Sequence, residues 1–557
     1  MIGFNLIDEP WIPVRARADG RLVRVGIEEA LLRAEEFSDL VGDVPTQVPA
    51  LLRQVLLPVV ADALGLPATF EEWGRRFAAH AFTSAEQEVL REYFTAHRDR
   101  FEVFDQERPF GQVAGLRTAK DETKSTALMV ATAASGNNVP LFSSRTDADV
   151  YPLAVDEAVR WLLHVQCWDT AAIKSGAVGD SKVKAGKTTG NPTGPLGQLG
   201  VLVPMGTSLY DTLLLNSPIL PGPQVGMPQW RAEKAASPEW DTRPAEALLD
   251  LWTWQSRRVR LLAEETGDGV RVTRVVLSAG DRLLELPDYE PHTAWKPVAD
   301  KKAAAGARRP RRLASGRAIW RGMQALLDVE HADREHTSDL LMQLSGLRGE
   351  GEIDEDYPLR LEAFGAVYGT QSAVVEDLLH DAIPLPISAL DRDGDVFELV
   401  VEATEQAEQL EKAINGLSHE LRRALRAEPI PWDKGNRPGA LVLHALDPLV
   451  RRMLAGVQTS GGDQDVLRRG QLAWELKAWE ATRRIADQVI AAAGPGTFGG
   501  RVIEVGQNKV ETLFSLGTAE GRFRKRLVEA LPRAAEHRRR VVAERRAVDD
   551  ERGEETA

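Results

Sequence analysis

The chain has 557 residues, of which 43% are hydrophobic and 27% are charged, and its formal net charge at pH 7 is −14. Single hydrophobic cores stop growing at roughly 250–300 residues, so this length and ordinary globular composition predict more than one domain and exclude a disordered scaffold. The acidic balance also argues against a free-standing DNA-binding protein, because neutralisation of phosphates by Lys and Arg supplies most of the affinity of such proteins. Nucleic-acid binding would have to come from local patches or from partner subunits.

The single cysteine, Cys167, excludes an intrachain disulfide and a zinc site built on several cysteines. The first residues have neither the basic nor the apolar region of a signal peptide. No apolar run reaches the roughly 18 residues of a membrane-spanning helix. The longest candidate, 51–66, is interrupted by Arg53, Asp62 and Gly65. These features predict a cytoplasmic protein.

The first part of the chain, to about residue 370, is predicted to mix helices and strands. Residues 4–14 form a short apolar segment, and residues 21–26 have the pattern of a paired strand. Apolar residues recur with helical spacing over 27–33, 48–64 and 156–168. Pro58 should kink the second of these helices, because proline lacks an amide hydrogen and clashes with the preceding turn.

A glycine-rich segment occupies residues 174–206. Its helix- and strand-breaking residues are Gly176, Gly179, Gly186, Gly190, Pro192, Gly194, Pro195, Gly197, Gly200 and Gly206. So many breakers cannot sit in a helix or a central strand, which predicts a long loop. Long loops inside compact domains are usually functional or disordered.

A basic run follows at residues 301–321, and it contains no acidic residue. Its cations are Lys301, Lys302, Arg308, Arg309, Arg311, Arg312, Arg317 and Arg321. The run is a local inversion of charge in an acidic chain. It fits a nucleic-acid patch and a solvated linker equally well.

Beyond Pro384 the pattern changes to long amphipathic helices. Apolar residues repeat at alternating three and four positions over 407–424 and 472–490, and two further helices are predicted over 441–457 and 522–548. Four helices joined by short breaks predict an antiparallel four-helix bundle. The fold class is therefore expected to be α+β, with a mixed domain over 1–383, a bundle over 384–548 and a frayed tail over 549–557.

Gly186-Lys187-Thr188 resembles the end of a phosphate-binding loop. That motif needs a glycine five positions earlier, where this chain has Ser181, and a helix directly after it. The glycines and prolines that follow are predicted to forbid that helix. A flexible backbone loop with Lys182, Lys184 and Lys187 near phosphates is the better functional interpretation, and a plain mobile surface loop is the alternative.

Catalytic and metal-binding patterns are weak. His380-Asp381 is a pair found in metal-dependent phosphohydrolases, but His331 and His336 do not share a helix face as further ligands would. We interpret His380 as an ordinary helix residue. No nucleophile elbow or paired acid and base stands out, so we expect neither an enzyme nor a metal site.

Several segments resemble the large subunit of type I-E CRISPR Cascade complexes, the CasA-type family. The opening residues 4–14 read Phe-Asn-Leu-Ile-Asp-Glu-Pro-Trp-Ile-Pro-Val, and 108–112 read Arg-Pro-Phe-Gly-Gln, similar to the family's Pro-Phe-x-Gln segment. Tyr368-Gly369-Thr370-Gln371-Ser372 resembles the family's wedge hairpin. The helix at 161–168, the glycine-rich segment, residues 209–216 and the helical ending follow in the family's order. The resemblance covers nearly the whole chain.

The resemblance implies a loop that holds the 5′ handle of a guide RNA. By position this loop is 136–143, with Asn137, Asn138, Leu141, Phe142 and Ser143 as candidate contacts. Phe142 could stack on a base, a common device in RNA recognition. Its alternative is an ordinary core phenylalanine beside Leu141.

The resemblance also implies recognition of the protospacer-adjacent motif (PAM) from the minor groove. The candidate contacts are a glycine loop within 186–197, a basic finger and a glutamine wedge. They comprise Lys184, Gly186, Lys187, Gly190, Gly194, Gly197, Arg282, Thr370 and Gln371. Arg282 stands where the family's basic finger should lie. For Gln371 the alternative is a solvated turn residue.

The implied function is an RNA-guided one without catalysis in this chain. The implied partners are the guide RNA, double-stranded target DNA, the other Cascade subunits and a separate helicase-nuclease recruited after unwinding. No cofactor is implied, and the cysteine-bound zinc of some relatives is absent. Two alternatives are a nucleotide-binding enzyme that uses Gly186-Lys187-Thr188, and an assembly scaffold without DNA contact.

Overall fold

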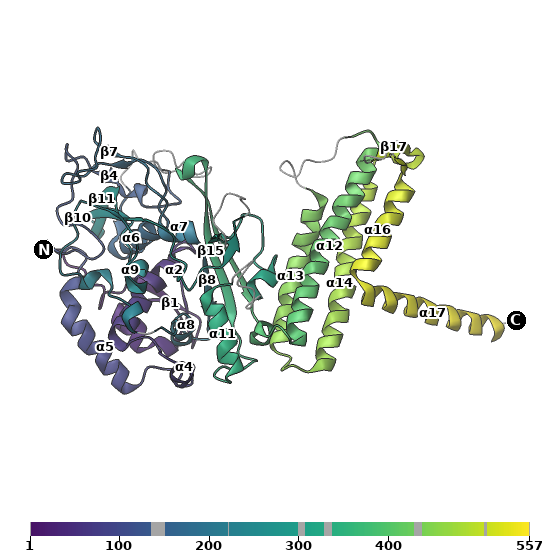
Figure 1. Cartoon of the computed structure of the whole chain (residues 1–557), viewed down its shortest axis with the longest axis horizontal. Helices are drawn as coiled ribbons and strands as arrows, with labels where there is room; N and C mark the ends of the chain where they lie inside the picture. The colour runs from purple at the N-terminus through teal and green to yellow at the C-terminus, as the bar shows by residue number, and fades with distance from the viewer. Residues whose placement is uncertain are drawn as a thin grey trace. The chain divides into compact units, whose positions relative to one another are not determined.

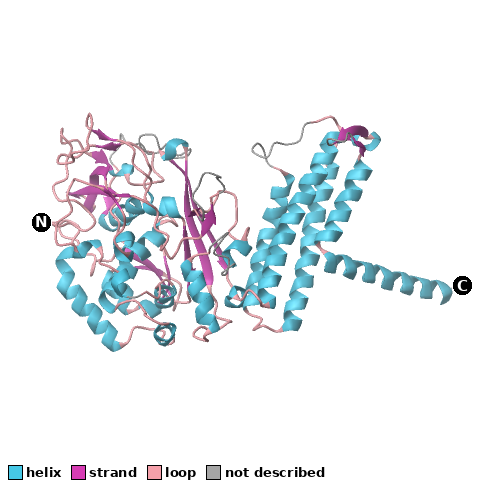
Figure 2. Cartoon of the chain, in the orientation of Figure 1, coloured by secondary structure: helices cyan, strands magenta, loops and turns pink. Residues whose placement is uncertain are grey.

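A computed structural model describes residues 2–134, 151–220, 222–298, 307–327, 337–427, 437–505 and 510–555. Helices and strands alternate along the first part of the chain, and long helices dominate the last part (Figure 2). This mixture confirms the predicted α+β class. The chain divides into two units. The first comprises Met1–Ile319, Ala325–Asp354 and Pro358–Ile383, and the second comprises Trp320–Gln324, Glu355–Tyr357 and Pro384–Ala557.

The N-terminal strands of the first unit form a three-stranded antiparallel sheet. β1 (Ile12–Ala16) lies between β2 (Leu22–Val25) and β3 (Phe37–Leu40). Ile12 and Val14 are fully buried, as expected for a strand that covers a core with alternate side chains. The paired strand predicted over 21–26 is confirmed as β2.

The helix predicted over 48–64 contains a π-helical turn. α2 (Gln47–Leu51) continues through Leu52–Leu56, which are π-helical, into α3 (Leu57–Leu64). Pro58 lies in the first turn of α3, so the irregularity expected at this proline takes the form of a π turn just before it. Within the described residues, Gln47–Leu64 alone is long and apolar enough to cross a membrane by length and composition, and 83% of it is buried inside the protein.

The mixed region contains further helices. They are α1 (Ile27–Leu32), α4 (Phe70–Phe77), α5 (Ser84–His97), α6 (Val155–Trp168), α8 (Leu209–Leu215), α9 (Leu248–Trp252), α10 (Met323–Leu327) and α11 (Asp339–Gly349). The predictions over 27–33 and 156–168 are confirmed as α1 and α6. α6 is buried along most of its length and packs against α2 and the strands β10 and β11, described next.

Two larger sheets position the candidate site. In the first, β10 (Arg257–Thr266) and β11 (Gly269–Ala279) form a long hairpin, and β11 also pairs with β4 (Lys124–Ser125) and β5 (Leu153–Ala154). In the second, β15 (Arg360–Tyr368) lies between β16 (Val375–Pro384) and β8 (Val201–Met205) (Figure 1). Two small pairs join β9 (Thr242–Arg243) to β12 (Arg282–Leu283) and β13 (Trp295–Pro297) to β14 (Arg308–Pro310).

The glycine-rich segment is more ordered than a long loop. β6 (Lys174–Ser175) pairs with β7 (Lys187–Thr188), and α7 (Pro195–Leu199) leads into β8. No helix follows Thr188 directly, as predicted, but the expectation that the breakers exclude any helix from 174–206 was wrong at α7. Proline at the first helical position lacks an amide hydrogen that would have no helical partner anyway. Gly200 then ends α7 with a positive φ of 74°.

The second unit is mainly helical. α12 (Asp395–Ala424) packs against α13 (Pro438–Gln458), α14 (Gln464–Ala491) and α16 (Leu516–Ala530) (Figure 1). These helices contain the stripes predicted over 407–424, 441–457 and 472–490. The short helix α15 (Gly496–Gly499) and a hairpin of β17 (Arg501–Val505) and β18 (Val510–Phe514) precede α16 and were not predicted.

The single helix predicted over 522–548 was wrong. The chain forms α16 and then α17 (Pro532–Glu555), and α17 runs away from the packed helices (Figure 1). Leu531 between them has a φ of −129° and a ψ of 67°, outside the helical region. This break has a direct cause, since a residue that precedes proline is disfavoured in the helical conformation.

Candidate nucleic-acid interface

The hairpin of β15 and β16 ends in a tight turn that carries Gln371. The amide of Gly369 donates to the carbonyl of Val374 over 3.1 Å, and the amide of Ser372 donates to the carbonyl of Gly369 over 2.8 Å. Gln371 and Ser372 have φ angles of 55° and 54°. Two successive non-glycine residues in this left-handed region carry a strain of about 1 kcal/mol or more each. Gln371 and Thr370 are exposed at this tip.

The tip rests on the chain that leaves α6. The carbonyl of Ser372 accepts a 2.8 Å hydrogen bond from the amide of Ala171. The hydroxyl of Tyr368 donates to the carbonyl of Trp168 over 2.7 Å. A Cβ on Gly197 would overlap the Tyr368 hydroxyl, so α7 also approaches the base of the hairpin as closely as a glycine permits.

Residues 170–193, which we call the site loop, begin beside this tip. The turn at the far end of the loop has positive φ at Ala185 and Gly186, and the Lys184 amide donates to the Lys187 carbonyl over 2.9 Å. The exposed residues at this end are Lys184, Ala185, Gly186, Lys187, Thr189 and Gly190. A cationic, glycine-containing turn of this kind can bring backbone amides and ammonium groups close to phosphates.

Gly194 and Gly197 are buried and belong to the packing of the site, not to its surface. A Cβ on Gly194 would overlap the backbone of Cys167 and Trp168 at the end of α6. Both glycines were expected to contact DNA directly, but their burial leaves no exposed surface for that contact. Gly186 and Gly190 are exposed and can still make it. The thiol of Cys167 is buried as well, and burial raises its pKa to about 12.

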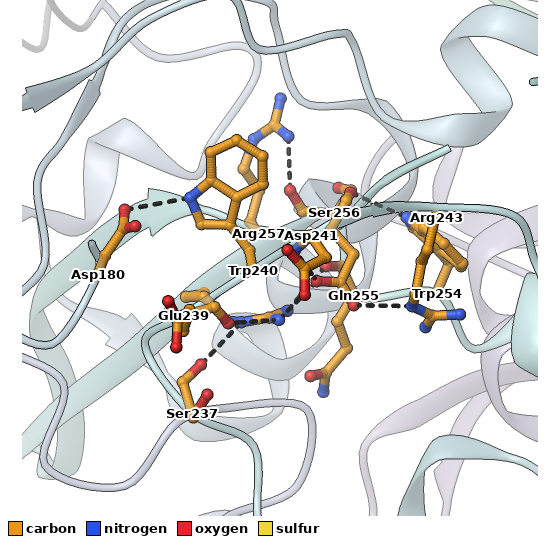
Figure 3. A network of polar contacts seen from close by, with 12 residues as sticks. Asp180, Ser237, Glu239, Trp240, Asp241, Arg243, Trp254, Gln255, Ser256 and Arg257 are labelled. Atoms are coloured by element: carbon orange, nitrogen blue, oxygen red, sulfur yellow. Dashed lines mark hydrogen bonds and ion pairs between the residues drawn. The ribbon is translucent and has the colours of Figure 1, made fainter. Parts of the chain in front are cut away.

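Trp240 contacts the site loop through its indole ring. Its indole nitrogen donates to Asp180 over 3.1 Å, a contact visible in Figure 3. The guanidinium carbon of Arg282 lies 4.0 Å from the ring centroid, and Lys182 Nζ lies 4.8 Å from it. Both partly exposed cations are thereby engaged by the indole ring.

Arg282 is directed at the site loop. Its Nη2 donates to the carbonyl of Thr189 over 2.9 Å and to the side chain of Asn191 over 3.1 Å. Burial lowers the pKa of this guanidinium, and the charge of Arg257 lowers it further. The geometry therefore makes Arg282 a support of the loop in this structure, and not a free basic finger.

Arg258 and Asp281 hold the segment that carries Trp240. Arg258 donates to the carbonyl of Ser237 over 2.9 Å and to Asp281 over 2.7 Å. The indole of Trp254 donates to the carbonyl of Asp281 over 3.0 Å, and Figure 3 shows Ser237, Trp240 and Trp254 within this polar network. The platform under the site loop is thus fixed by charge-assisted hydrogen bonds, which are stronger than neutral ones.

The base of the site loop contains a buried ion pair. Lys174 Nζ lies 2.7 Å from Asp169 Oδ2, and Arg257 also contacts this carboxylate. Burial opposes ionisation of Asp169, but the charges of Lys174 and Arg257 hold its pKa below its usual value. Asp169 therefore remains a charged carboxylate, and it holds Lys174 and Arg257 together at the base of the site loop.

Other predicted contacts fall elsewhere. Residues 135–150 contain Asn137, Asn138, Leu141, Phe142 and Ser143, and they lie outside the described residues. In the basic run, Arg308 and Arg309 are exposed on β14. Arg312 donates from Nε to the Gln198 carbonyl of α7 over 2.8 Å, which brings this part of the run beside the site.

The rival chemistries gain little from the geometry. Lys187 and Thr188 lie on β7, not at a helix start, and Thr188 is buried with its hydroxyl 3.4 Å from Asp180. His380 is on strand β16, so its interpretation as a helix residue was wrong; the pairing of β16 with β15 is a long-range contact that a two-residue pattern does not contain. Its Nε2 lies 2.9 Å from Glu362. Among the described residues, no group of three or more His, Cys, Asp or Glu side chains could hold a metal ion.

Sequence reasoning missed the residues that hold the site loop and the hairpin tip in place. Trp240, Asp169, Arg257 and Ala171 come from three separate stretches of the chain, and nothing in their local sequence marks them as partners. One signal was present: Arg257 and Arg258 open a strand that is otherwise apolar at alternate positions. Charged residues at buried strand positions need partners, so the pair pointed to a polar network.

The chain was compared with protein families and with solved structures. A family model described as "CRISPR-associated protein Cse1" matches residues 5–485. A curated relative from Thermus thermophilus, "CRISPR-associated protein CasA/Cse1", is 31% identical over 510 residues, which is 86% of this chain and 92% of that protein. The crystal structure of Thermobifida fusca Cse1 is 30% identical with a TM-score of 0.79, and the match covers 96% of this chain and 99% of the other.

A chain from a structure described as "CRISPR RNA-guided surveillance complex" has the same fold. It is 18% identical to this chain with a TM-score of 0.63, and the match covers 88% of this chain and 100% of the other.

Proposed function

This chain belongs to the CRISPR-associated protein Cse1 (CasA) family, and we propose that it is the large subunit of a type I-E Cascade that reads the PAM in double-stranded DNA and starts strand separation. The observation that carries the proposal is the exposed Gln371 at a left-handed hairpin tip, hydrogen-bonded through Ser372 to the start of the site loop. The hairpin tip is thereby attached to the start of the loop whose far end carries the exposed Lys184, Gly186 and Lys187.

The site loop is the element proposed to read the PAM. Lys184 and Lys187 supply charge for phosphates, while Gly186 and Gly190 let the backbone approach the groove without a Cβ in the way. The minor groove mainly separates A·T from G·C pairs, so a reader of this kind should tolerate several related PAM sequences. Arg282 and Trp240 would hold the loop in its reading position.

Gln371 is proposed to act as the wedge below the PAM. Separating one base-pair step costs stacking energy of about 1.4 kcal/mol, in addition to the pairing itself. An amide side chain inserted at that step occupies the gap and offers a donor and an acceptor to the freed bases. Thr370, exposed beside it, would contribute a smaller contact.

The remaining assignments follow from the same proposal. The guide RNA would bind through residues 136–143, and the other Cascade subunits would carry most of the contact with nucleic acid, which agrees with a net charge of −14 in this chain. A separate helicase-nuclease would be recruited after unwinding, so this chain would not cleave DNA. We further propose that α12, α13, α14 and α16 form a four-helix bundle and that the protein acts in the cytoplasm.

Nucleotide hydrolysis is the rival that the sequence raised, and it makes an opposite prediction. We expect no ATPase activity, because Gly186-Lys187-Thr188 lies in a strand turn that offers no helix N-terminus to phosphates. ATP hydrolysis by the purified chain that disappears with Lys187→Ala would favour the rival.

The experiment is a binding assay of the reconstituted complex, with and without this chain, on DNA with varied PAM. Gly190→Ala should reduce binding to PAM-containing DNA and leave assembly intact, because a Cβ would stand between the loop and the groove. Gly20→Ala is a matched control, since both glycines have φ near 70° and Gly20 has open space around it. Equal loss of binding on DNA with and without a PAM would remove the PAM-reading role and favour an assembly scaffold.

A further inference from the structure

Arg257 occupies the base of the site loop, with only 1% of its surface exposed. It is the first residue of β10, and its backbone is bonded on both sides to the Gln166 side chain of α6, over 2.9 and 3.0 Å. The guanidinium is therefore delivered from a rigid strand anchored to a rigid helix. An arginine held in this way has a fixed reach and direction.

The guanidinium joins the two ends of the site loop. Nη2 donates to the carbonyl of Thr170 and to the carbonyl of Pro192, each over 2.8 Å. Nε contacts the carboxylate of Asp169, and Nη1 donates to the carbonyl of Ser256 over 2.6 Å. One side chain thus closes a loop whose ends are far apart in sequence.

Two further hydrogen bonds join the two ends of the site loop, residues 169–172 and 191–194, which we call the neck. The amide of Gly194 donates to the carbonyl of Asp169 over 2.9 Å, and the side chain of Asn191 donates to the carbonyl of Ala172 over 3.2 Å. The hairpin tip is attached within this neck, because Ala171 lies between the Thr170 held by Arg257 and the Ala172 held by Asn191. The position of Gln371 therefore depends on the position of the neck.

We propose that Arg257 is a positioning residue that fixes the spacing between the site loop and Gln371, and so couples PAM reading to strand opening. This inference rests on the proposed function of the site. Arg257 does not contact nucleic acid itself, since its side chain is buried. It acts through the backbone carbonyls that it holds.

Only a guanidinium can make this set of contacts. Arginine presents donors in a rigid planar fork that can reach a carboxylate and several carbonyls at once. In Arg257→Lys the charge beside Asp169 remains, but one ammonium nitrogen cannot span the same acceptors. This substitution therefore loosens the neck without leaving the carboxylate unpaired, because Lys174 also stays in place.

The test compares Arg257→Lys with Arg160→Lys in the reconstituted complex. Arg160 is a matched control, because its side chain is also 1% exposed and holds Asp43, Asp156 and the Trp11 carbonyl away from the site. The readout is the ratio of R-loop formation rates on DNA with and without a PAM. We expect Arg257→Lys to lower that ratio about tenfold, the scale of one lost charge-assisted hydrogen bond, and Arg160→Lys to preserve it.

Combination with Gln371→Ala separates positioning from general destabilisation. If Arg257 acts by placing Gln371, the rate loss caused by Arg257→Lys should be smaller when Gln371 is already alanine, because the two changes remove one shared effect. Additive losses would overturn the inference. Tyr368→Phe removes only the hydroxyl bond to Trp168 and should show the same coupling with a smaller loss, even if Arg257→Lys fails to fold.

The outcomes also separate this inference from the proposed function. A wild-type complex without PAM dependence would reject the proposed function itself. A PAM-dependent wild type with an unchanged ratio in both Arg257→Lys and Tyr368→Phe would reject the role of Arg257 alone.

Discussion

Gln371 owes its exposure to the backbone of a single turn. Glutamine and serine do not favour the left-handed region that Gln371 and Ser372 occupy, so local propensity could not predict this conformation. The sequence placed Gln371 at a hairpin tip only through a family resemblance. The structure shows that this turn is strained and that the hydrogen bond from the amide of Ala171 to Ser372 helps to hold it. Strained residues of this kind persist where surrounding contacts fix them, and they cluster at functional sites.

Arg282 illustrates the opposite case, in which a basic residue singled out from the sequence makes its contacts with other protein groups. A basic residue was expected near this position as a finger toward DNA. Stacking on Trp240 and two hydrogen bonds to the site loop turn it inward instead. Trp240 lies about forty residues earlier in the chain, and no periodicity links the two positions, so only tertiary structure could show the contact.

Buried histidines make the stability of the first unit depend on pH. Burial lowers the pKa of His164 to about 3 and that of His292 to about 4. The unfolded chain protonates both groups near their ordinary pKa of about 6.5, so it binds more protons than the folded chain below that pH. Stability should therefore fall as pH drops from about 6.5 toward 4, by about 1.4 kcal/mol per pH unit for each histidine.

Thermal unfolding between about pH 7 and pH 4.5 measures this effect. His164→Gln should reduce the dependence of the free energy of unfolding on pH by the contribution of about one proton. The hydroxyl of Thr46, 3.0 Å from His164, can bond to an amide, and an amide does not titrate. A slope that is the same in this variant and in the wild type would contradict the assignment of His164.

At the scale of elements, periodicity predicted the long helices well and the short elements poorly. The stripes of α6, α12, α13 and α14 extend over several turns, so their patterns are unambiguous. α7 has only five residues between two glycines and begins with proline. Its stability comes from burial against α6 and β15, which a local pattern does not contain.

The two classes of glycine in the site can be separated by stability. Gly194→Ala should lower the free energy of unfolding by about 1–3 kcal/mol, because the new Cβ overlaps the Cys167 backbone and overpacking cannot be relieved by a flexible side chain. Gly190→Ala should cost about 1 kcal/mol, from its positive φ alone. Denaturant unfolding of both variants measures the difference, and equal losses would contradict the packing role of Gly194.

At the scale of the whole molecule, the charge balance and the site are consistent. A chain with a net charge of −14 can contact DNA through a small surface such as the exposed turn around Gly186, provided that partners hold the rest of the nucleic acid. Composition argued against a solitary DNA binder, but it could not locate the surface. The candidate surface needed the fold, in which Ala171 bonds to Ser372 and Arg282 contacts both Thr189 and Trp240.

Attachment to the guide-loaded complex is expected to depend on Phe142. Base–aromatic stacking contributes about 1–3 kcal/mol per base, so Phe142→Ala should weaken association of this chain with the complex roughly tenfold to a hundredfold. Titration of labelled chain into complex lacking it measures the affinity. Unchanged affinity in a stably folded variant would assign Phe142 to the core.

The most direct test of the account is the rate of R-loop formation by complexes carrying Gln371→Ala, on intact duplex and on DNA with a pre-formed bubble beside the PAM. The wedge offsets part of the cost of parting the first base pair, a cost that the bubble has already removed. Gln371→Ala should therefore slow R-loop formation on the duplex and have much less effect on the bubble, and Thr370→Ala should give a milder defect of the same kind. Equal impairment on both substrates would contradict the wedge and place Gln371 in folding or docking.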